Sequence, residues 1–302
     1  MHTLNLGTLP FEGAPLDSPH HAADTDQYAL DENPRYRILR GFASRYLTDT
    51  RDVRIYLPEA YLSDPTRNFP VFYLHDGQNL FDGRTSYMPG HTWRAHLTAD
   101  RLTAEGRIEP IILVGVDNAG DRRMAEYTPT RDPEYGGGEG PLYGRMIVDE
   151  LKPILDTTLR TLRDAPNTAL GGSSLGGLLS LFLGLQYPNV FGKLAVLSPS
   201  VWWDHRSILH TIGAPRRFSI PRFASNPPAE PTPPRARIWL DMGTAEGLRH
   251  LRDCDVLARR LSTRGWLPGQ ELSYTRFPDA VHNEDAWADR FGQVLAFLFP
   301  AH

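Results

Sequence analysis

The sequence has almost no cysteine: among its 302 residues, only Cys254 is one. A disulfide within the chain is therefore excluded, and so is a structural zinc site built from several thiolates. A long apolar run is also missing, because the longest candidate, residues 178–185, is far shorter than the roughly 18 residues that cross a bilayer. The N-terminus lacks the basic and apolar segments of a secretory signal. These absences predict a cytoplasmic protein that does not enter a membrane.

A large excess of charge of either sign is missing as well. The 32 lysines and arginines nearly balance the 36 aspartates and glutamates, which leaves a formal net charge of -4. A nucleic acid or an anionic membrane surface attracts a strongly basic protein, so neither is an expected partner. Hydrophobic residues make up 40% of the chain, as in ordinary globular proteins. The oligomeric state stays open.

Proline marks two irregular parts of the chain. Residues 1–33 are polar and proline-rich, which predicts an irregular N-terminal arm. Around residues 213–236 prolines are too frequent for regular helix or sheet, and this insertion fits either a lid over a site or a mobile surface segment. The prolines are Pro215, Pro221, Pro227, Pro228, Pro231, Pro233 and Pro234. The rest, residues 34–302, is predicted to form one domain, since α/β proteins of this size often do.

Short apolar segments predict the strands. Residues 36–42 and 52–57 alternate between large apolar and polar residues, which indicates antiparallel strands with one wet face. The other segments are mostly continuous apolar runs, typical of parallel strands buried on both faces. They are residues 70–75, 110–116, 168–170, 193–197 and 237–240, followed by a last strand at 271–277.

Helical periodicity separates these runs. Apolar residues recur at three- and four-residue spacing in 92–102, 143–159, 177–187 and 248–264. Strands that alternate with helices predict an α/β fold with a mostly parallel central sheet flanked by helices.

The segment after the strand at 168–170 contains the most informative motif. Residues 172–176 read Gly-Ser-Ser-Leu-Gly, a G-x-S-x-G sequence with an apolar strand before it and an amphipathic helix after it. That context predicts a sharp turn that raises the Ser174 hydroxyl above the sheet as a nucleophile. Glycines at 172 and 176 would remove Cβ atoms that clash with neighbouring elements. The N–H of Leu175, at the start of the helix, would bind an oxyanion.

A nucleophilic serine needs a base, and a histidine should follow the last strand. Among the eleven histidines, His282 alone has this position, directly after the strand at 271–277. A carboxylate must orient its imidazole. The strand at 237–240 is followed by Asp241 and, further on, by Glu246, so that both are candidates, with Asp253 a more distant one.

Several motifs in matching order resemble the putative-esterase family of α/β-hydrolases, which includes siderophore esterases, carbohydrate esterases, S-formylglutathione hydrolase and the antigen 85 mycolyltransferases. The resemblance runs from about residue 36 to 299. The motifs are YLHDGQNLFD (73–82), VGVDNAG with RRMAEYTP (114–129), GSSLGG (172–177), LSPSVWWD (197–204), DMGTAEG (241–247) and HNEDAW (282–287). The resemblance implies an α/β-hydrolase fold that cleaves esters, and it favours Glu246 as the acid, since in related esterases the acid follows a Gly-Thr pair by two residues.

The resemblance also suggests how the pocket is lined. Gln78, in the loop after the strand at 70–75, is implied as the second oxyanion donor through its backbone N–H. Trp202 and Trp203 follow the end of another strand, where ligands bind in such sheets, and either could stack on substrate or pack in the core. Asp76 and Arg122 are further candidates for substrate contact. Asp76, Asp82 and Asp117 could form a carboxylate cluster, but the serine mechanism needs no metal, and no metal or cofactor is expected.

The sequence therefore predicts a serine esterase that acts on a small-molecule ester through an acyl-serine intermediate. Two alternatives stay open. The same three residues could transfer the acyl group to an alcohol, or the chain could be a non-catalytic ligand-binding protein on a hydrolase scaffold.

Overall fold

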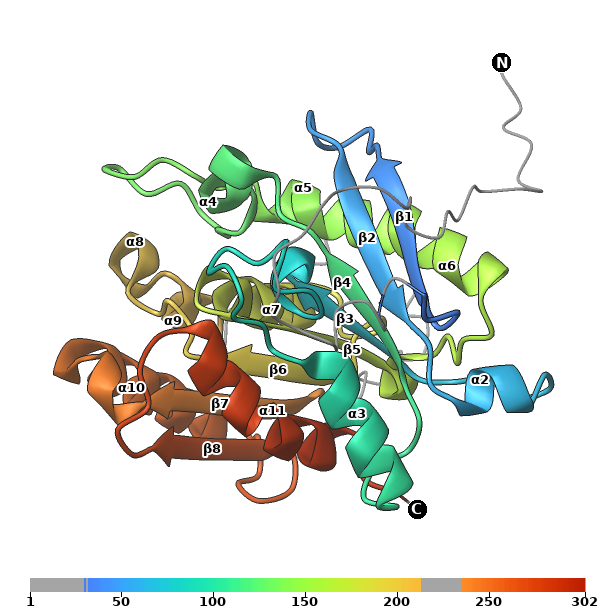
Figure 1. The fold of residues 1–302 in the computed structure, drawn as a ribbon. Helices are drawn as coiled ribbons and strands as arrows, with labels where there is room; N and C mark the ends of the chain where they lie inside the picture. Colours follow the sequence, from blue (N-terminus) through green and yellow to red (C-terminus); the bar gives the residue numbers. More distant parts are fainter. Residues whose placement is uncertain (1–29, 31, 213–234, 302) are drawn as a thin grey trace, which may run out of the picture.

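The computed structural model describes residues 30, 32–212 and 235–301. Most of the predicted N-terminal arm and of the insertion at 213–236 lies outside these residues. The described chain forms an eight-stranded sheet in the order β1-β2-β4-β3-β5-β6-β7-β8 (Figure 1). The strands are β1 (Tyr36–Phe42), β2 (Arg51–Tyr56), β3 (Val71–His75), β4 (Ile112–Val116), β5 (Thr168–Ser173), β6 (Lys193–Leu197), β7 (Arg237–Gly243) and β8 (Leu272–Phe277).

The sheet is mostly parallel, as the sequence predicts. Strands β3 to β8 run parallel to one another, whereas β2 is antiparallel both to β4 and to the edge strand β1, with Tyr36 of β1 opposite Tyr56 of β2. Strands β5 and β7 continue three residues beyond the apolar runs that predicted them. In β5 the extension is Gly171–Ser173, whose residues pair with β6 and are buried. Pairing with neighbours overrides the low strand preference of glycine here.

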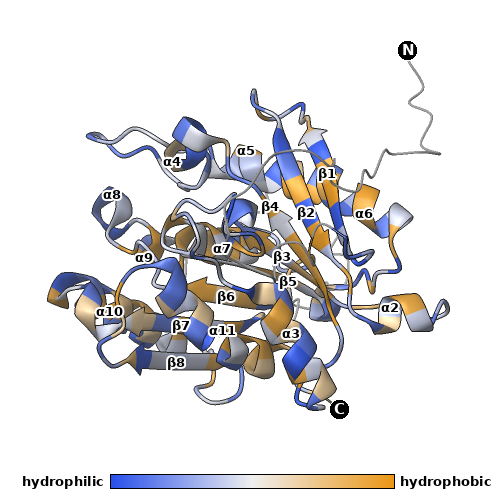
Figure 2. Cartoon of the chain, in the orientation of Figure 1, coloured by the Kyte–Doolittle hydropathy of each residue, from blue (hydrophilic) through white to orange (hydrophobic). Residues whose placement is uncertain are grey.

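Helices cover both faces of the sheet. Successive strand residues point to opposite faces, so that Tyr73 belongs to one apolar cluster and Phe72 to the other. Helices α3 and α11 cover one face, while α5, α6, α7 and α10 cover the other (Figure 1). Figure 2 shows hydrophobic residues along central strands such as β6. The main helices are α3 (Ala95–Ala104), α5 (Gly140–Arg145), α6 (Lys152–Thr158), α7 (Leu175–Gln186), α10 (Leu248–Thr263) and α11 (Glu284–Leu298).

Short helical segments complete the chain. They are α2 (Ala60–Ser63), η1 (Gly77–Asn79), η2 (Gly120–Arg122), α4 (Arg123–Glu126), η4 (Ala165–Asn167), α8 (Trp203–Arg206), α9 (Ile208–Thr211) and η5 (Thr244–Glu246). The single helix predicted at 143–159 is divided, because a π-helical turn, η3 (Met146–Leu151), separates α5 from α6. Pro153 lies two residues after the end of this turn. Its ring cannot donate an N–H and crowds the carbonyl four residues earlier, which disfavours a regular α-helix there.

The strand order creates a crevice at the carboxyl ends of the central strands. From β3 the chain moves outward to β4, whereas β5 pairs with β3 on its other side. The loops that leave the carboxyl ends of β3 and β5 therefore diverge, and ligands bind at such a point in open α/β sheets. The predicted nucleophile follows β5, and the predicted oxyanion loop follows β3.

Candidate active site

Ser174 occupies a strained turn between β5 and α7. Its φ of 58° and ψ of -121° are unfavourable for a residue with a side chain, and such strain concentrates at functional sites. Two backbone hydrogen bonds hold the turn: the Ser174 N–H donates to the Leu197 carbonyl at 3.0 Å, and the Ser174 carbonyl accepts from Ser200 N–H at 3.1 Å. The serine is thus fixed to the end of β6 as well as to its own strand.

Glycines make this turn possible by close packing. A Cβ on Gly172 would lie 3.1 Å from the His75 Cβ, and one on Gly176 would lie 3.2 Å from the same atom. The packing around Gly177 is tighter still, since a Cβ added there would lie 2.8 Å from the Leu197 carbonyl oxygen. Gly172 and Gly176 of the G-x-S-x-G motif therefore let α7 approach β3, and Gly177, just after the motif, lets it approach β6.

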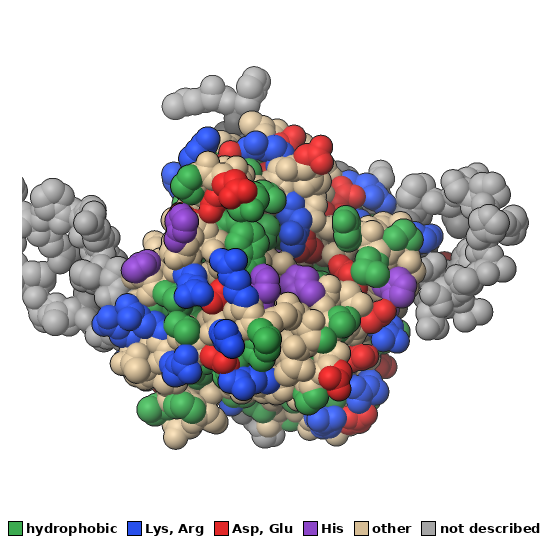
Figure 3. All heavy atoms as spheres, turned by 90° about the vertical axis from the view of Figure 1, so that its left-hand side faces the viewer, with side chains coloured by type: hydrophobic (Ala, Val, Ile, Leu, Met, Phe, Trp, Pro, Cys, Tyr) green, Lys and Arg blue, Asp and Glu red, His purple; other side chains and the backbone are tan. Residues whose placement is uncertain are grey.

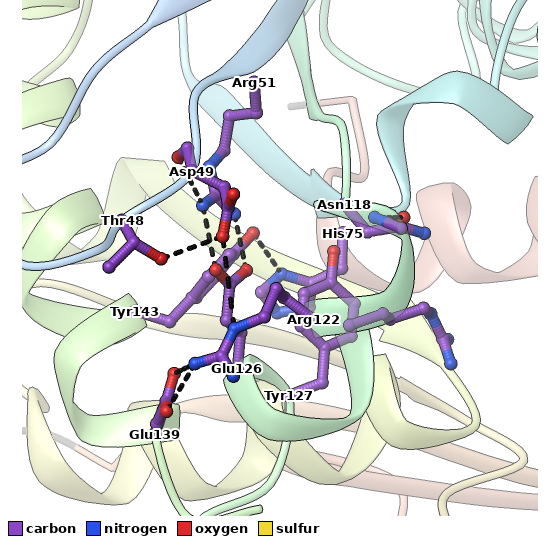
Figure 4. Close-up of polar contacts among 12 residues, drawn as sticks. Thr48, Asp49, Arg51, His75, Asn118, Arg122, Glu126, Tyr127, Glu139 and Tyr143 are labelled. Atoms are coloured by element: carbon purple, nitrogen blue, oxygen red, sulfur yellow. Dashed lines mark hydrogen bonds and ion pairs between the residues drawn. The ribbon is translucent and has the colours of Figure 1, made fainter.

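His75 lies directly beneath the turn. The ring is buried, its Nδ1 is 3.2 Å from the Tyr143 hydroxyl, and its Nε2 has no hydrogen-bond partner in the described structure (Figure 4). Burial lowers the pKa of His75 from 6.5 to about 3, because a low-dielectric site disfavours the charged form. The ring beneath the turn is therefore neutral at physiological pH.

We expect His75 to weaken the fold in mild acid. Its pKa is lower in the folded than in the unfolded chain, so its stabilising contribution is complete above pH 6.5 and falls as the pH drops toward 3. At pH 5 the loss should be roughly 2 kcal/mol relative to neutral pH. Between pH 7 and 5, the free energy of unfolding measured with urea should fall less for His75→Gln than for the wild type. His210→Gln, which changes an exposed histidine, should show the same fall as the wild type. The same dependence of the unfolding free energy on pH in the wild type and in His75→Gln would contradict this prediction.

The structure brings His282 together with Glu246. His282 Nδ1 lies 2.6 Å from Glu246 Oε2. His282 is in the loop between β8 and α11, and Asn283 caps the helix by accepting a hydrogen bond from Ala286 N–H at 2.9 Å. Glu246 ends the turn η5 just after β7. The pair thus joins the loops that follow two neighbouring strands.

Glu246 is buried and well supplied with donors. Its side chain is 2% exposed, against 45% for His282. Its Oε1 accepts hydrogen bonds from the Ser198 hydroxyl at 2.6 Å and from Gly243 N–H at 2.8 Å. Burial alone would raise the pKa of this carboxyl, but the bonds from His282 and Ser198 outweigh it, and the pKa is lowered. Glu246 is consequently ionised at neutral pH.

The rival carboxylates lie elsewhere. Asp241 is fully buried within β7, where its carboxylate accepts bonds from Trp239 Nε1 at 2.7 Å and Ser198 N–H at 3.2 Å. Burial raises the pKa of Asp241 to about 6, although Arg290 opposes the shift. Asp253 pairs with Arg206 at 2.6 Å. Of the three candidates, the structure brings only Glu246 to His282.

Two cavities meet at Ser174 and His282, which line both of them. The first, here called the polar cavity, has a volume of about 340 Å³ and includes Asp76, Asn79, Asn118, Arg123, Glu284 and Trp287. The second, the Trp202 cavity, has about 280 Å³ and includes Ser198, Pro199, Ser200, Trp202, Met242 and His250. A larger cavity of about 650 Å³ lies between α10 and β8 and contains none of these residues. Figure 3 views the face where the parallel strands end, with histidine and arginine side chains near its middle.

Two predicted pocket residues lie outside these cavities. Trp203 is 1% exposed and donates its indole N–H to the Thr130 carbonyl at 2.9 Å, so that of the two alternatives left open by the sequence it takes the place in the core. Trp202, by contrast, lines a cavity. Arg122 is exposed and pairs with Glu139, as Figure 4 shows. The structure therefore corrects the prediction for Arg122.

Arg123 takes the place predicted for Arg122. It begins α4 and forms a two-pronged pair with Asp76, at 2.7 and 2.8 Å. Asn118 also donates to Asp76, at 2.6 Å, so the predicted Asp76 lies in the polar cavity as part of a fixed network. Arg123 lies in the RRMAEYTP motif and, like Arg122, follows a predicted strand, so the sequence already pointed to it, whereas Glu284, two residues after His282, was not among the predicted site residues.

The two predicted oxyanion donors lie at the start of helical segments that follow adjacent strands, β3 and β5. Gln78 lies in η1 after β3, where its side-chain carbonyl accepts from Asn118 N–H at 3.2 Å. Leu175 is the first residue of α7, after β5. Gly77 allows η1 to approach β4, because a Cβ there would lie 2.5 Å from the carbonyl carbon of Gly115. Both turns thus flank the crevice at the point where the strand order reverses.

Among the described residues, neither a metal cluster nor a membrane-spanning helix is present. No group of three or more histidine, cysteine, aspartate or glutamate side chains among them is placed to hold a metal ion. Within the same ranges, no helix has the length and apolar character needed to cross a membrane.

A mostly parallel sheet, a strained serine between β5 and α7, and a histidine–carboxylate pair on the loops after β8 and β7 define an α/β-hydrolase. The family model described as "Putative esterase" matches residues 44–298, and the chain belongs to that family. It is a carboxylic ester hydrolase, as the motifs predict.

Known proteins with similar sequences include esterases. The chain is 25% identical over 275 residues to the uncharacterized protein YbbA of Bacillus subtilis, covering 86% of this chain and 97% of that protein. It is 28% identical over 233 residues to the iron(III) salmochelin esterase of Escherichia coli, and 30% identical over 186 residues to an endo-1,4-beta-xylanase/feruloyl esterase of Xylanibacter ruminicola. These two alignments cover 72% and 59% of this chain, but only 47% and 24% of the relatives' own lengths.

Solved structures show the same fold at lower identity. The BES protein from Bacillus cereus superposes with a TM-score of 0.67 at 18% identity, over 95% of this chain and 99% of that one. The enterobactin esterase FES from Shigella flexneri gives a TM-score of 0.63 at 20% identity, over 88% and 59% of the two chains. The α/β-hydrolase fold predicted from the motifs is confirmed.

Proposed function

We propose that this esterase works through Ser174, His282 and Glu246 and forms an acyl-serine intermediate. The observation that carries the proposal is the joint position of the three residues. Ser174 and His282 line the same two cavities, and His282 lies 2.6 Å from the buried Glu246. In the first step the Ser174 oxygen attacks the ester carbonyl and the alcohol leaves. Water then attacks the acyl-serine and releases the acid.

His282 would carry the proton in both steps. With Nδ1–H donated to Glu246, the other ring nitrogen is left to accept the Ser174 proton and later to give it to the leaving alcohol. The positive imidazolium that forms would be stabilised by Glu246, whose lowered pKa keeps it charged. Glu246 thus orients the ring and balances its charge.

Backbone N–H groups would bind the oxyanion. Leu175 presents its N–H at the start of α7, where the helix dipole also favours negative charge. Gln78 supplies the second N–H from the turn after β3. Loss of one such donor typically costs about 100- to 1,000-fold in rate. Because the Gln78 donor is a backbone group, its side chain should matter less than its place in the turn.

The two cavities would hold the two halves of a small ester. The polar cavity offers the guanidinium of Arg123, the amide of Asn118 and the carboxyl of Glu284, which suit a half with several polar groups. The Trp202 cavity offers an indole and the thioether of Met242, which suit a flatter or more apolar half. Because relatives are named as an iron(III) salmochelin esterase and a feruloyl esterase, a siderophore ester and a feruloyl ester are the first natural substrates to test.

A fluorophosphonate probe should label the wild-type protein on Ser174, because the probe reacts with serines activated by an adjacent base. Mass spectrometry of the tryptic digest should place the adduct on the peptide that contains Ser174. Ser180, on the same helix, bonds to the Gly176 carbonyl, and a Ser180→Ala variant should be labelled like the wild type. An unlabelled wild-type protein would favour the binding-protein alternative. Product analysis with added alcohol would separate hydrolysis from acyl transfer.

A further inference from the structure

We propose that Arg290 is a positioning residue that holds the Glu246 carboxylate against His282, acting largely through the Ser198 hydroxyl. The inference rests on the proposed role of Glu246. Arg290 lies on α11, behind the histidine–carboxylate pair and outside both cavities, and none of the sequence motifs includes it.

Ser198 is the centre of the arrangement. It follows β6 with a φ of 41°, a left-handed conformation that is unusual for serine. Its hydroxyl donates to Glu246 Oε1 at 2.6 Å and accepts from Trp287 Nε1 at 3.1 Å. It also accepts a short bond from Arg290 Nη2. With both acceptor positions filled by N–H groups, the hydroxyl hydrogen has one direction left, toward Glu246.

Arg290 is itself shared between two carboxylates. Its Nη2 lies 3.1 Å from Asp241 Oδ1 and 3.6 Å from Glu246 Oε1, and its side chain is 1% exposed. Its Nε and Nη1 have no hydrogen-bond partner in the described structure. Leaving a buried donor unpaired costs about 1 to 3 kcal/mol, and buried ion pairs often add little to stability. Stability alone therefore explains this arginine poorly, whereas a role in the site explains why its charge is retained.

The charges around Glu246 show what Arg290 contributes. The ionisable groups that meet here are Asp241, Glu246 and Arg290, with His282 on the solvent side. Without the guanidinium, two buried carboxyls would face each other with no buried cation between them. Burial already raises the pKa of Asp241 to about 6, and Arg290 opposes that shift. Removal of Arg290 would also free the Ser198 hydroxyl to turn away from Glu246.

One face of helix α11 contacts both the His282 ring and the Ser198 hydroxyl that bonds to Glu246. Residues three apart on a helix lie on the same side, and Trp287 and Arg290 have this spacing. The Trp287 ring meets the His282 ring edge to face at 4.9 Å, while its indole N–H bonds to Ser198. The helix that begins just after His282 therefore also fixes the carboxylate that His282 contacts.

A double-mutant cycle tests the inference. In the full chain, Arg290→Gln should lower kcat for p-nitrophenyl acetate by roughly 10- to 100-fold, with little change in KM, because it disturbs the chemical step. In a Glu246→Gln background the same change should have almost no further effect. Arg290→Lys should recover part of the loss, because it keeps the charge. Arg276→Gln, which breaks the ion pair between the exposed Arg276 on β8 and Asp255 on α10, should behave like the wild type.

The outcomes separate this inference from the proposed function. An equal loss from Arg290→Gln in both backgrounds, or a loss borne by KM, would show that the arginine acts only on the fold and would overturn the positioning role. Should Arg290→Gln fail to fold, Ser198→Ala serves in the same cycle, since it removes the bond to Glu246 and retains the arginine. Full activity in a Ser174→Ala variant would instead reject the proposed function itself.

Discussion

Replacing Ser174 by alanine should lower kcat for p-nitrophenyl acetate by on the order of 10⁵- to 10⁶-fold, as loss of the nucleophile does in other serine hydrolases. The hydroxyl is the group proposed to bond to the acyl carbon, and an alanine side chain has no oxygen to take its place. The expected loss reflects chemistry, because within the described ranges the Ser174 side chain forms only one hydrogen bond, a long one to the Ser200 hydroxyl at 3.3 Å. Wild-type turnover by the Ser174→Ala protein would contradict the assignment.

Ser174→Gly provides a matched control for the fold. Glycine adopts a φ of 58° without the penalty that a side chain brings. This variant should therefore be as inactive as Ser174→Ala but more stable than the wild type, by about 1 kcal/mol in urea unfolding. A stable, inactive Ser174→Gly protein would show that the strain serves the reaction, whereas reduced stability would mean that the turn is held mainly by the serine side chain.

Replacing Glu246 by glutamine should lower kcat by about 10³- to 10⁴-fold, the scale seen when the acid of a serine triad is neutralised. A glutamine can present its N–H₂ to His282 Nδ1, which would favour the tautomer whose other nitrogen carries a proton and cannot accept one from Ser174. The amide also has no charge to stabilise the imidazolium. Measurement of kcat and KM near pH 8 should place the loss in kcat.

Asp241→Asn is the informative comparison for Glu246→Gln. Asp241 makes no contact with His282 and bonds instead to Trp239, Ser198 and Arg290, so that kcat of the folded protein should fall far less. Its raised pKa means that the protonated form is favoured in the fold, and this stabilising contribution is lost as the pH rises from 3.8 to about 6. A large loss for Asp241→Asn together with a small one for Glu246→Gln would reverse the assignment of the acid.

The sheet was largely predictable because its strands are buried on both faces. Continuous apolar runs such as 193–197 can satisfy that environment, and β6 has these same bounds. The predicted bounds of strands and helices were wrong where tertiary packing, rather than the local sequence, determines where an element ends. Strand β5 continues through two glycines because β6 lies beside it, and the helix at 143–159 changes to a π-turn before Pro153. Neither feature leaves a periodic signal in the sequence.

The choice of the acid shows a similar limit. Asp241 directly follows the apolar run at 237–240, so that from the sequence it stands at a strand end. In the structure β7 continues to Gly243, which leaves Asp241 inside the sheet and moves the strand end toward Glu246. Only the resemblance to related esterases favoured Glu246 beforehand. Strand length depends on pairing with β6 and β8, which the local sequence does not record.

Side-chain direction was the least predictable property of the site. Arg122 ends the turn η2 and Arg123 begins α4, and this change of backbone sends the two side chains to different partners. Trp202 and Trp203 separate in the same way, one into a cavity and one into the core. Adjacent residues with the same side chain give no sequence signal for which one faces the ligand.

The meeting of two cavities at one serine has a consequence for the fate of the acyl group. Once the alcohol half departs, its cavity empties while the acyl half still fills the other. Whatever enters the vacated space next reaches the acyl-serine beside His282, which is partly open to solvent. Water entering there gives hydrolysis, and a second alcohol that fits the same space gives a new ester. In the proposed mechanism, the ratio of acid to new ester should thus follow how well an added alcohol competes with water for the emptied cavity, rather than any change in the three residues proposed to perform the chemistry.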